Sequence, residues 1–343
     1  MARLTANDVA RLAGVSVGTV SRVVNRKTVA PDVKHRVEAA IAHLGWSPNA
    51  VAQSMRTAST RMIGCIFSDI RNPLYNNIIK GAEEALSAQG YVLMVASSGE
   101  NPAREAALIE LFARRRADGL LLSLADESSQ PVIDAIAAAK VPTVLVERDL
   151  PLEAVSVGTD HRAGMKRATE YLISLGHRRI ALITGGQKNR AGRERLLGYM
   201  DAMRDAGLTV DQDLLRLDSL SSHYAFNETQ HLFGLTNPPT AIISGGSQML
   251  AGVLRAARLK RVSIPDELSV INSGDTELAE LATPPVTVIR WDLEAVGREG
   301  AAILLKMIAG TAAKNLGRIE LPNEIVLRES CTPPRAQLRI QRT

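Results

Sequence analysis

The chain contains 343 residues with a formal net charge of +5, and 45% of the residues are hydrophobic. This length predicts at least two domains with sizeable cores. Residues 1–60 hold eight Lys or Arg against three Asp or Glu, so this segment carries the whole basic surplus and residues 61–343 are balanced. A surplus confined to one small segment is suited to neutralising a phosphate backbone.

The sequence argues against export, membrane insertion and metal binding. Its N-terminus is polar and lacks the apolar core of a signal peptide, and no apolar run reaches transmembrane length. Cys65 and Cys331 lie far apart, and the six histidines show no ligand spacing. We therefore expect a cytoplasmic protein with reduced thiols, no metal and no cofactor.

Residues 5–14 predict a short helix and the turn that follows it. Thr5 and Asp8 have the spacing of a capping box. The apolar positions that share one face are Val9, Leu12 and Ala13. Gly14 supplies the turn, because glycine enters the left-handed conformation at low cost.

Ser16 is placed to cap a second helix. Its inward positions are Val20, Val23 and Val24, and its outward positions are Val17, Gly18, Ser21, Arg22 and Asn25. Two short helices joined at a glycine are typical of a helix-turn-helix, whose second helix enters the major groove and presents its first side chains to base edges. The alternative is an ordinary helical hairpin.

A third helix is predicted between Pro31, which suits a first turn, and Gly45, which ends the run. The apolar positions between them are Val33, Val37, Ala40, Ile41 and Leu44. The next segment, Ser47–Arg56, has a cap and a first-turn proline but is too short to be a stable helix alone. We expect it to need a partner, such as DNA together with a second copy of the segment.

From Arg61 onward, apolar strand candidates alternate with helical patterns. The strand candidates are Met62–Phe67, Tyr91–Ala96, Leu120–Ser123, Pro142–Val146, Ile180–Thr184, Thr240–Ser244 and Leu268–Ser273, and the helices include 75–89, 103–116 and 163–175. Continuous apolar strands between helices indicate parallel sheets covered on both faces. About 280 residues exceed one such sheet, so we expect two doubly wound lobes. A ligand then binds between the lobes, at the carboxyl ends of the strands.

The run DVARLAGVSVGTVSRVVN, followed by SPNAVAQSMRT, resembles the headpiece and hinge of the LacI/GalR family of bacterial transcription regulators. RNPLYNNIIKGAEEALSAQGY, ADGLLL, LGHRRIALITG, GRERLLGYMDAM and IPDELSVI then follow in the family's order.

The resemblance implies an N-terminal all-α helix-turn-helix headpiece and an α/β unit of two doubly wound parallel sheets, like a periplasmic binding protein. The implied headpiece is 1–58 with a hinge helix at about 48–57, and the second unit is 61–343. Within it, the N-lobe is expected at about 61–160 and 290–318 and the C-lobe at about 161–289 and 319–333, with crossovers near Asp160, Ile289 and Ile319.

The resemblance also implies the partners: double-stranded operator DNA, a small-molecule effector and a second copy of the chain in a homodimer, with no membrane. Arg22 is the expected guanine reader. Val17 and Gly18 offer methyl contact or close approach, and Met55 is the expected wedge in the minor groove. The expected backbone-phosphate contacts are Thr5, Ser16, Thr19, Ser21 and Asn25. Repression is the favoured outcome, with activation left open.

For the effector, Arg195 matches a family arginine that clamps the ligand through its guanidinium fork. Tyr75 and Trp291 are implied as packing residues, and an indole face suits a sugar ring. The remaining expected contacts are Glu147, Arg148 and Asp275. This chain has Gly246 and Ser247 where many relatives have Asn-Asp, which favours an acidic sugar or a carboxylate- or phosphate-bearing metabolite over a neutral hexose.

Two rival classes remain at this point. An enzyme is disfavoured because the chain has neither a dinucleotide fingerprint nor a Walker-type phosphate loop, and residues 245–249 lack the last glycine of a nucleophile elbow. A free solute-binding protein would have a secretion signal and no basic headpiece. Salt-sensitive DNA binding separates both rivals from a regulator.

Overall fold

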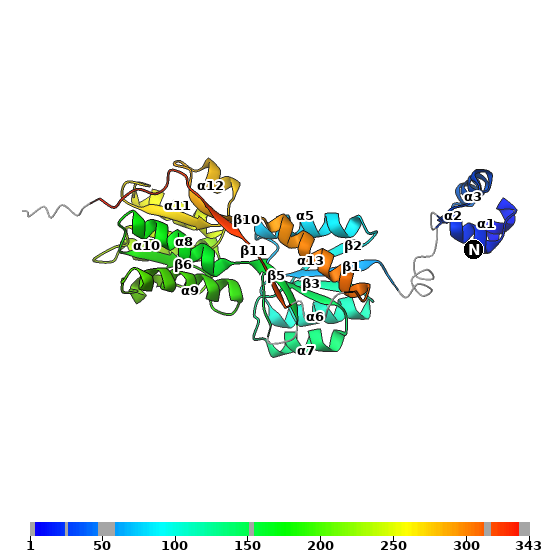
Figure 1. Ribbon diagram of the computed structural model, residues 1–343, viewed down its shortest axis with the longest axis horizontal. Coiled ribbons are helices and arrows are strands. Elements are labelled where there is room, and N and C mark those ends of the chain that lie inside the picture. The colour runs from blue at the N-terminus through cyan, green and yellow to red at the C-terminus, as the bar shows by residue number, and fades with distance from the viewer. Residues whose placement is uncertain (1–3, 25–26, 47–58, 151–153, 312–316, 336–343) are drawn as a thin grey trace, which may run out of the picture. The chain divides into compact units, whose positions relative to one another are not determined.

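The computed structural model describes residues 4–24, 27–46, 59–150, 154–311 and 317–335 (Figure 1). The chain divides into two compact units, Met1–Thr60 and Arg61–Thr343. We call them the headpiece and the two-lobed unit. The expected hinge helix, which includes Met55, lies outside the described residues. Asn25, at the end of the second expected helix, lies outside them as well.

The headpiece contains the three expected helices, α1 (Ala6–Ala13), α2 (Val17–Val24) and α3 (Pro31–Leu44). The Asp8 carboxylate accepts hydrogen bonds from the Thr5 N–H at 2.9 Å and the Thr5 hydroxyl at 2.8 Å. Gly14 ends α1 with a φ of 63°. The Ser16 hydroxyl oxygen accepts from the Thr19 N–H at 3.2 Å and so caps α2.

One side chain of α1 lies on the opposite side from that expected. The sequence pattern predicts Leu12 on the inward face, but Leu12 is 51% exposed, whereas Ala10 is buried. The buried stripe is therefore Val9, Ala10 and Ala13, which packs with Val20 and Val37. The difference arises because α2 and α3 both contact this two-turn helix, and together they cover residue 10 and leave residue 12 in solvent.

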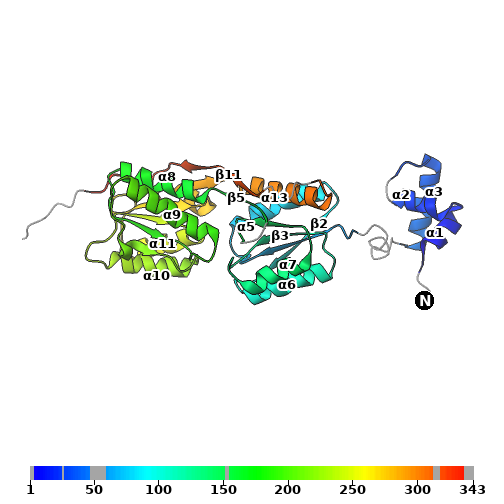
Figure 2. The same cartoon turned by 60° about the horizontal axis from the view of Figure 1, so that its bottom comes forward.

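The N-lobe is a parallel sheet with the strand order β11-β5-β4-β3-β1-β2. Its strands are β1 (Met62–Phe67), β2 (Val92–Ser97), β3 (Gly119–Ser123), β4 (Thr143–Val146), β5 (Val155–Thr159) and β11 (Arg318–Leu321). Its helices pair as α5 (Leu74–Ser87) with α13 (Leu293–Ile308) on one face and α6 (Pro102–Arg114) with α7 (Gln130–Ala139) on the other (Figures 1 and 2). Two-sided burial explains why the inner strands are continuous apolar runs.

The C-lobe repeats this arrangement with the strand order β12-β10-β9-β8-β6-β7. Its strands are β6 (Ile180–Ile183), β7 (Leu215–Arg216), β8 (Ala241–Ser244), β9 (Ser269–Ser273), β10 (Thr287–Trp291) and the antiparallel β12 (Asn323–Val326). Its helices pair as α8 (His161–Ser174) with α9 (Arg190–Asp205), and α10 (Ser222–Phe233) with α11 (Met249–Lys260). The short helices η1 (Gln212–Leu214) and α12 (Glu277–Leu281) lie between these elements.

All seven expected strands are present, and each end lies within one residue of its expected position. The chain crosses between lobes three times: after β5, after β10, and between β11 and β12. Two expected lobe boundaries were early. Residues 290–291 still belong to β10 of the C-lobe, and residues 319–321 still pair with β5 in the N-lobe. Each crossing occurs only where its strand ends.

Helices α5 and α13 approach each other through two glycines. A Cβ atom added at Gly297 would lie 2.0 Å from the carbonyl oxygen of Ile78, and one added at Gly81 would lie 2.0 Å from that of Glu294. We expect Gly297→Ala to lower the free energy of unfolding by about 1–3 kcal/mol, because backbone atoms must move apart. Urea unfolding followed by circular dichroism measures this change.

Gly300→Ala is the matched control on the same helix. A Cβ there would meet only an ordinary contact, 3.7 Å from Val146 Cγ2. We expect it to change stability by less than about 1 kcal/mol, since alanine also favours the helix. Equal destabilisation by the two variants would contradict the close-approach argument.

Candidate functional site

The outward side of α2 is small, polar and exposed. Val17, Gly18 and Arg22 are exposed, and Ser21 is half-buried. These positions share one side of the helix because residues four apart lie one above the other. Val20 and Val23 are buried on the other side. Arg22 is therefore the charged residue of this outward side.

Two expected phosphate contacts flank that side and also hold the local fold. Ser16 is exposed and Thr19 is half-buried, and their hydroxyl oxygens lie 3.0 Å apart. Thr5 is exposed at the start of α1. The structure thus brings Thr5, Ser16, Thr19, Ser21 and Arg22 together in one helix-turn-helix.

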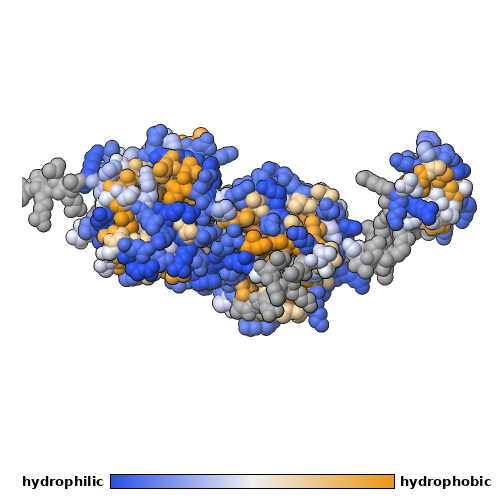
Figure 3. All heavy atoms as spheres, viewed as in Figure 1, coloured by the Kyte–Doolittle hydropathy of each residue, from blue (hydrophilic) through white to orange (hydrophobic). Residues whose placement is uncertain are grey.

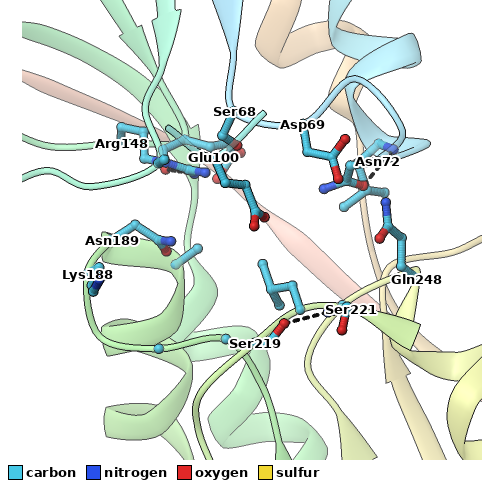
Figure 4. Close-up of a pocket in the computed structure, with 18 of the residues that line it drawn as sticks. Ser68, Asp69, Asn72, Glu100, Arg148, Lys188, Asn189, Ser219, Ser221 and Gln248 are labelled. Atoms are coloured by element: carbon cyan, nitrogen blue, oxygen red, sulfur yellow. Dashed lines mark hydrogen bonds between the residues drawn. The ribbon is translucent and has the colours of Figure 1, made fainter. Parts of the chain in front are cut away.

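A cleft of about 670 Å³ lies between the lobes. Its walls follow the carboxyl ends of strands. In the N-lobe they are residues 68–69 and 71–72 after β1, 125–126 after β3 and 147–148 after β4, and in the C-lobe they are 185–189, 217–221 and 246–248. Figure 4 shows Ser68, Asp69, Asn72, Glu100 and Arg148 across the cavity from Lys188, Asn189, Ser219, Ser221 and Gln248. This is where parallel sheets place ligands.

Tyr75 and Arg148 both line the cleft, and each is engaged by the protein. The Tyr75 hydroxyl lies 3.0 Å from the Ser68 hydroxyl and accepts from Arg148 Nη2 at 3.2 Å. Arg148 also donates through Nη1 to the Glu147 carbonyl at 2.8 Å and through Nε to the Leu124 carbonyl. These bonds hold the Arg148 guanidinium in the N-lobe wall.

Glu147 is a buried carboxylate with a φ of 58°. Its Oε2 atom lies 2.7 Å from His161 Nε2 and accepts from the Thr159 hydroxyl at 3.3 Å. Burial raises the pKa of Glu147, but His161 and Arg148 outweigh burial and bring the pKa down to about 2. Glu147, which lines the cleft, is therefore ionised near pH 7.

His161, the first residue of α8, lines the cleft and was not identified from the sequence. Burial, with the positive charge of Arg195, lowers its pKa to about 4, so the ring is neutral near pH 7. Trp291 meets its ring edge-on with centroids 5.4 Å apart. The position of His161, directly after the helix cap Asp160 and the strand β5, could have identified it as a cleft residue. The sequence pattern does not predict β5, so it does not place His161 at the end of a strand.

Arg195 is a buried cation of the cleft whose Nε atom is available to a ligand. It lines the cavity, it is 5% exposed, and its buried Nε atom has no hydrogen-bond partner among the residues described. Burial, helped by Arg148, lowers its pKa to about 10, and the Glu147 carboxylate opposes that shift. A buried polar group without a partner calls for an explanation, and a ligand supplies one.

Asp275 does not belong with these residues. It is absent from the cavity wall, and both its oxygens accept from Arg328 Nη2 at 2.9 Å. Arg290 lies 3.7 Å away on the same side. This carboxylate, in the loop after β9, is thus linked to Arg290 of β10 and to Arg328 after β12. A contact between Asp275 and the effector stays a prediction. Gly246 and Ser247 do line the cleft.

The charges of the cavity wall do not favour anions. The acidic residues are Asp69, Glu100, Asp126, Glu147 and Asp218, and the basic residues are Arg71, Arg148, Lys188 and Arg195. Within the described ranges, no cluster of His, Cys, Asp and Glu could hold a metal ion. Across the same ranges, every helix is too short or too polar to cross a bilayer.

Stability should depend on pH through His161. The pKa of His161 is about 4 in the folded protein and about 6.5 in the unfolded chain. As the pH drops from about 6.5 to about 4, the unfolded chain therefore binds a proton that the folded protein does not bind, and the free energy of unfolding falls. We expect His161→Gln to remove up to about 1.4 kcal/mol per pH unit of this slope. Calorimetry between about pH 7 and about pH 4.5 measures the slope.

A smaller slope should remain in the variant, because burial also lowers the pKa of His177. An unchanged slope in His161→Gln would mean that His161 is protonated equally in both states.

Comparison with known proteins supports both units. Residues 5–49 match the model of the lacI family of bacterial regulatory proteins, and residues 169–331 match that of the periplasmic binding protein-like domain. The chain is 30% identical to the HTH-type transcriptional regulator DegA of Bacillus subtilis (strain 168), over 96% of this chain and 99% of DegA. It is 33% identical to the ribose operon repressor of Escherichia coli (strain K12), over 89% and 93%.

Solved structures agree over nearly the whole length. The Lac repressor dimer bound to operator and the anti-inducer ONPF matches with a TM-score of 0.86 and 26% identity, over 96% of this chain and 100% of that one. The complex of the transcriptional regulator CelR with cellobiose matches with a TM-score of 0.74 and 31% identity over the same shares. The chain therefore belongs to the lacI family and is a DNA-binding transcriptional regulator.

Proposed function

We propose that the protein is a ligand-responsive repressor that acts in the cytoplasm, binds a palindromic operator as a homodimer, and takes a small metabolite into the interlobe cleft. The observation that carries the proposal is the presence, in one chain, of a basic helix-turn-helix unit and of a cleft whose buried Arg195 Nε has no hydrogen-bond partner in the described part of the chain. The relative named as the ribose operon repressor supports it.

Specificity for the operator would depend on Arg22. A guanidinium can donate two hydrogen bonds to guanine O6 and N7, whereas Val17 and Gly18 offer only small apolar contact. The hydroxyls of Thr5, Ser16, Thr19 and Ser21 would then bind phosphates and fix the register of docking. Asn25 and Met55 remain expected contacts, with backbone and minor groove respectively.

Arg22→Ala should remove sequence preference and leave weak, salt-dependent binding. The loss of a bidentate contact corresponds to about 1–3 kcal/mol of discrimination against the wrong base. Binding-site selection from random duplexes with the full chain measures the preference.

Arg11→Ala provides the matched control, because Arg11 is an exposed arginine of α1 whose ion pair with Asp8 is 3.5 Å long. We expect this variant to select the same site as the parent. Selection of that site by Arg22→Ala as well would show that α2 is not the reading helix, and absence of salt-sensitive binding by the parent would reject the proposed function.

The surface supports a symmetric dimer. The strand β2 forms one edge of the N-lobe sheet, and its Val92 and Met94 are 60% and 48% exposed. In the C-lobe, Leu281 of α12 is 78% exposed. Figure 3 shows apolar side chains reaching the surface of both lobes. Exposed edges and apolar patches are pairing surfaces, and a twofold dimer reads a palindrome.

For the effector we propose a carbohydrate or a related metabolite. Arg195 can donate to vicinal hydroxyls or to a carboxylate, and Trp291 lines the same cavity. The excess of acidic residues in the wall weighs against the strongly anionic ligand that the sequence favoured. A sugar, a sugar acid and a sugar phosphate are therefore to be compared directly.

Arg195→Gln should abolish the thermal shift that the best ligand of such a panel gives the parent protein, while operator binding without ligand is retained. Charge-assisted hydrogen bonds are worth about 1.5–3 kcal/mol each, so affinity should fall at least tenfold. Arg162→Gln is the control, because Arg162 pairs with Asp201 outside the cleft. A normal ligand shift in Arg195→Gln would remove the arginine from the site.

A further inference from the structure

Beside the cleft, the lobes are also joined by buried ion pairs that involve the first turn of α9. Glu127 lies in the N-lobe between β3 and α7 and is 4% exposed. Arg190 is the first residue of α9 in the C-lobe and is 7% exposed. Neither residue was singled out from the sequence.

The Glu127 side chain accepts three hydrogen bonds. Its Oε1 atom accepts from the N–H of Arg190 at 2.9 Å and, within its own lobe, from the N–H of Asp149 at 3.0 Å. Its Oε2 atom accepts from Arg193 Nη2 at 2.6 Å. The backbone N–H of Glu127 donates to the Lys188 carbonyl at 3.0 Å. Three of these four bonds cross between the lobes.

The Arg190 side chain is held by the N-lobe as well. Its Nε atom lies 3.1 Å from Asp149 Oδ2, its Nη1 donates to the Thr159 carbonyl at 3.3 Å, and its Nη2 pairs with Glu320. Arg318 of β11 also binds Asp149 and Glu320. The start of a C-lobe helix is therefore enclosed by N-lobe acceptors.

The same helix start forms part of the cleft. Lys188 and Asn189 lie in the cavity wall, and Arg195 follows within the next turn and a half of α9. A helix is stiff over this distance. A ligand that pulls on Arg195 thus moves the groups that Glu127 binds.

We propose that Glu127 is an interlobe latch, which fixes the α9 N-terminus to the N-lobe and sets the arrangement of the lobes that an effector in the cleft stabilises or releases. Only the regulatory role rests on the proposed function. The latch itself is a property of the chain without ligand or DNA.

Glu127→Gln is the direct variant because it keeps the shape of the side chain and removes its charge. The amide has one acceptor oxygen in place of two, and its NH2 group cannot accept from Arg193. Arg193→Gln is the second variant, since of the four Glu127 bonds it removes only the one to Oε2, and Arg193 is 39% exposed at its side chain. It also removes the bond from Arg193 Nη1 to the Gln187 carbonyl at 3.1 Å. Glu228→Gln is the control, because Glu228 pairs with Arg216 at 2.8 Å within the C-lobe.

The test is amide hydrogen exchange of the full chain, measured by mass spectrometry without effector or operator. In Glu127→Gln, we expect peptides covering 125–128 and 187–193 to exchange about tenfold faster, with a smaller change in Arg193→Gln. The sheets should keep their protection. In Glu228→Gln, we expect faster exchange only near Arg216.

Unchanged exchange at 187–193 in Glu127→Gln overturns the proposal. Uniformly faster exchange throughout both lobes in Glu127→Gln and Arg193→Gln also overturns it, because the contacts would then support the fold as a whole. Neither result bears on the proposed function, which operator selection by the same proteins tests separately.

Discussion

The cleft depends on one constraint: strands of a parallel sheet all end at the same edge. Each lobe has one such edge, and the three crossings hold the two edges opposite each other. Loops after β1, β3 and β4 therefore face loops after β6, β7 and β8. Residues more than 200 positions apart in the sequence, such as Tyr75 and Trp291, therefore line the same cavity.

Within the cleft, hydrogen bonding decides which charges remain available. Arg148 is engaged by two carbonyl oxygens and the Tyr75 hydroxyl. Glu147 is engaged through Oε2 by His161 and Thr159, whereas its buried Oε1 atom has no hydrogen-bond partner among the described residues. The buried Nε of Arg195 lacks such a partner among the described residues. Charge counts along the sequence treat Arg148 and Arg195 alike. The structure distinguishes the two arginines by their hydrogen-bond partners, because a desolvated charge interacts strongly only with groups that lie close to it in a suitable orientation.

Much of the fold could be predicted because its signals are local. A few consecutive residues are enough to predict several elements. These are the strands buried on both faces, the turn of the headpiece at its glycine and the start of α3 at its proline. The strand β5, with the sequence VSVGT, and the strand β12, with the sequence NEIV, were missed because small or polar residues break their apolar pattern. Leu12 was misplaced because two neighbouring helices, and not the periodicity of α1, decide which side is covered.

The candidate site was less accessible to prediction because its important contacts join distant segments. Motif position was enough to place Arg195, Tyr75 and Trp291 around one cavity. It did not reveal that Asp275 is bound by Arg328, 53 residues away, or that His161 lies against Glu147. Nor did it single out Glu127, which looks like an ordinary loop acid. Its neighbours Arg190 and Arg193 come from the other lobe, so its role follows from the way the two sheets are joined. Coupling between a ligand in the cleft and the arrangement of the lobes therefore depends on contacts that cannot be predicted from the positions of motifs in the sequence.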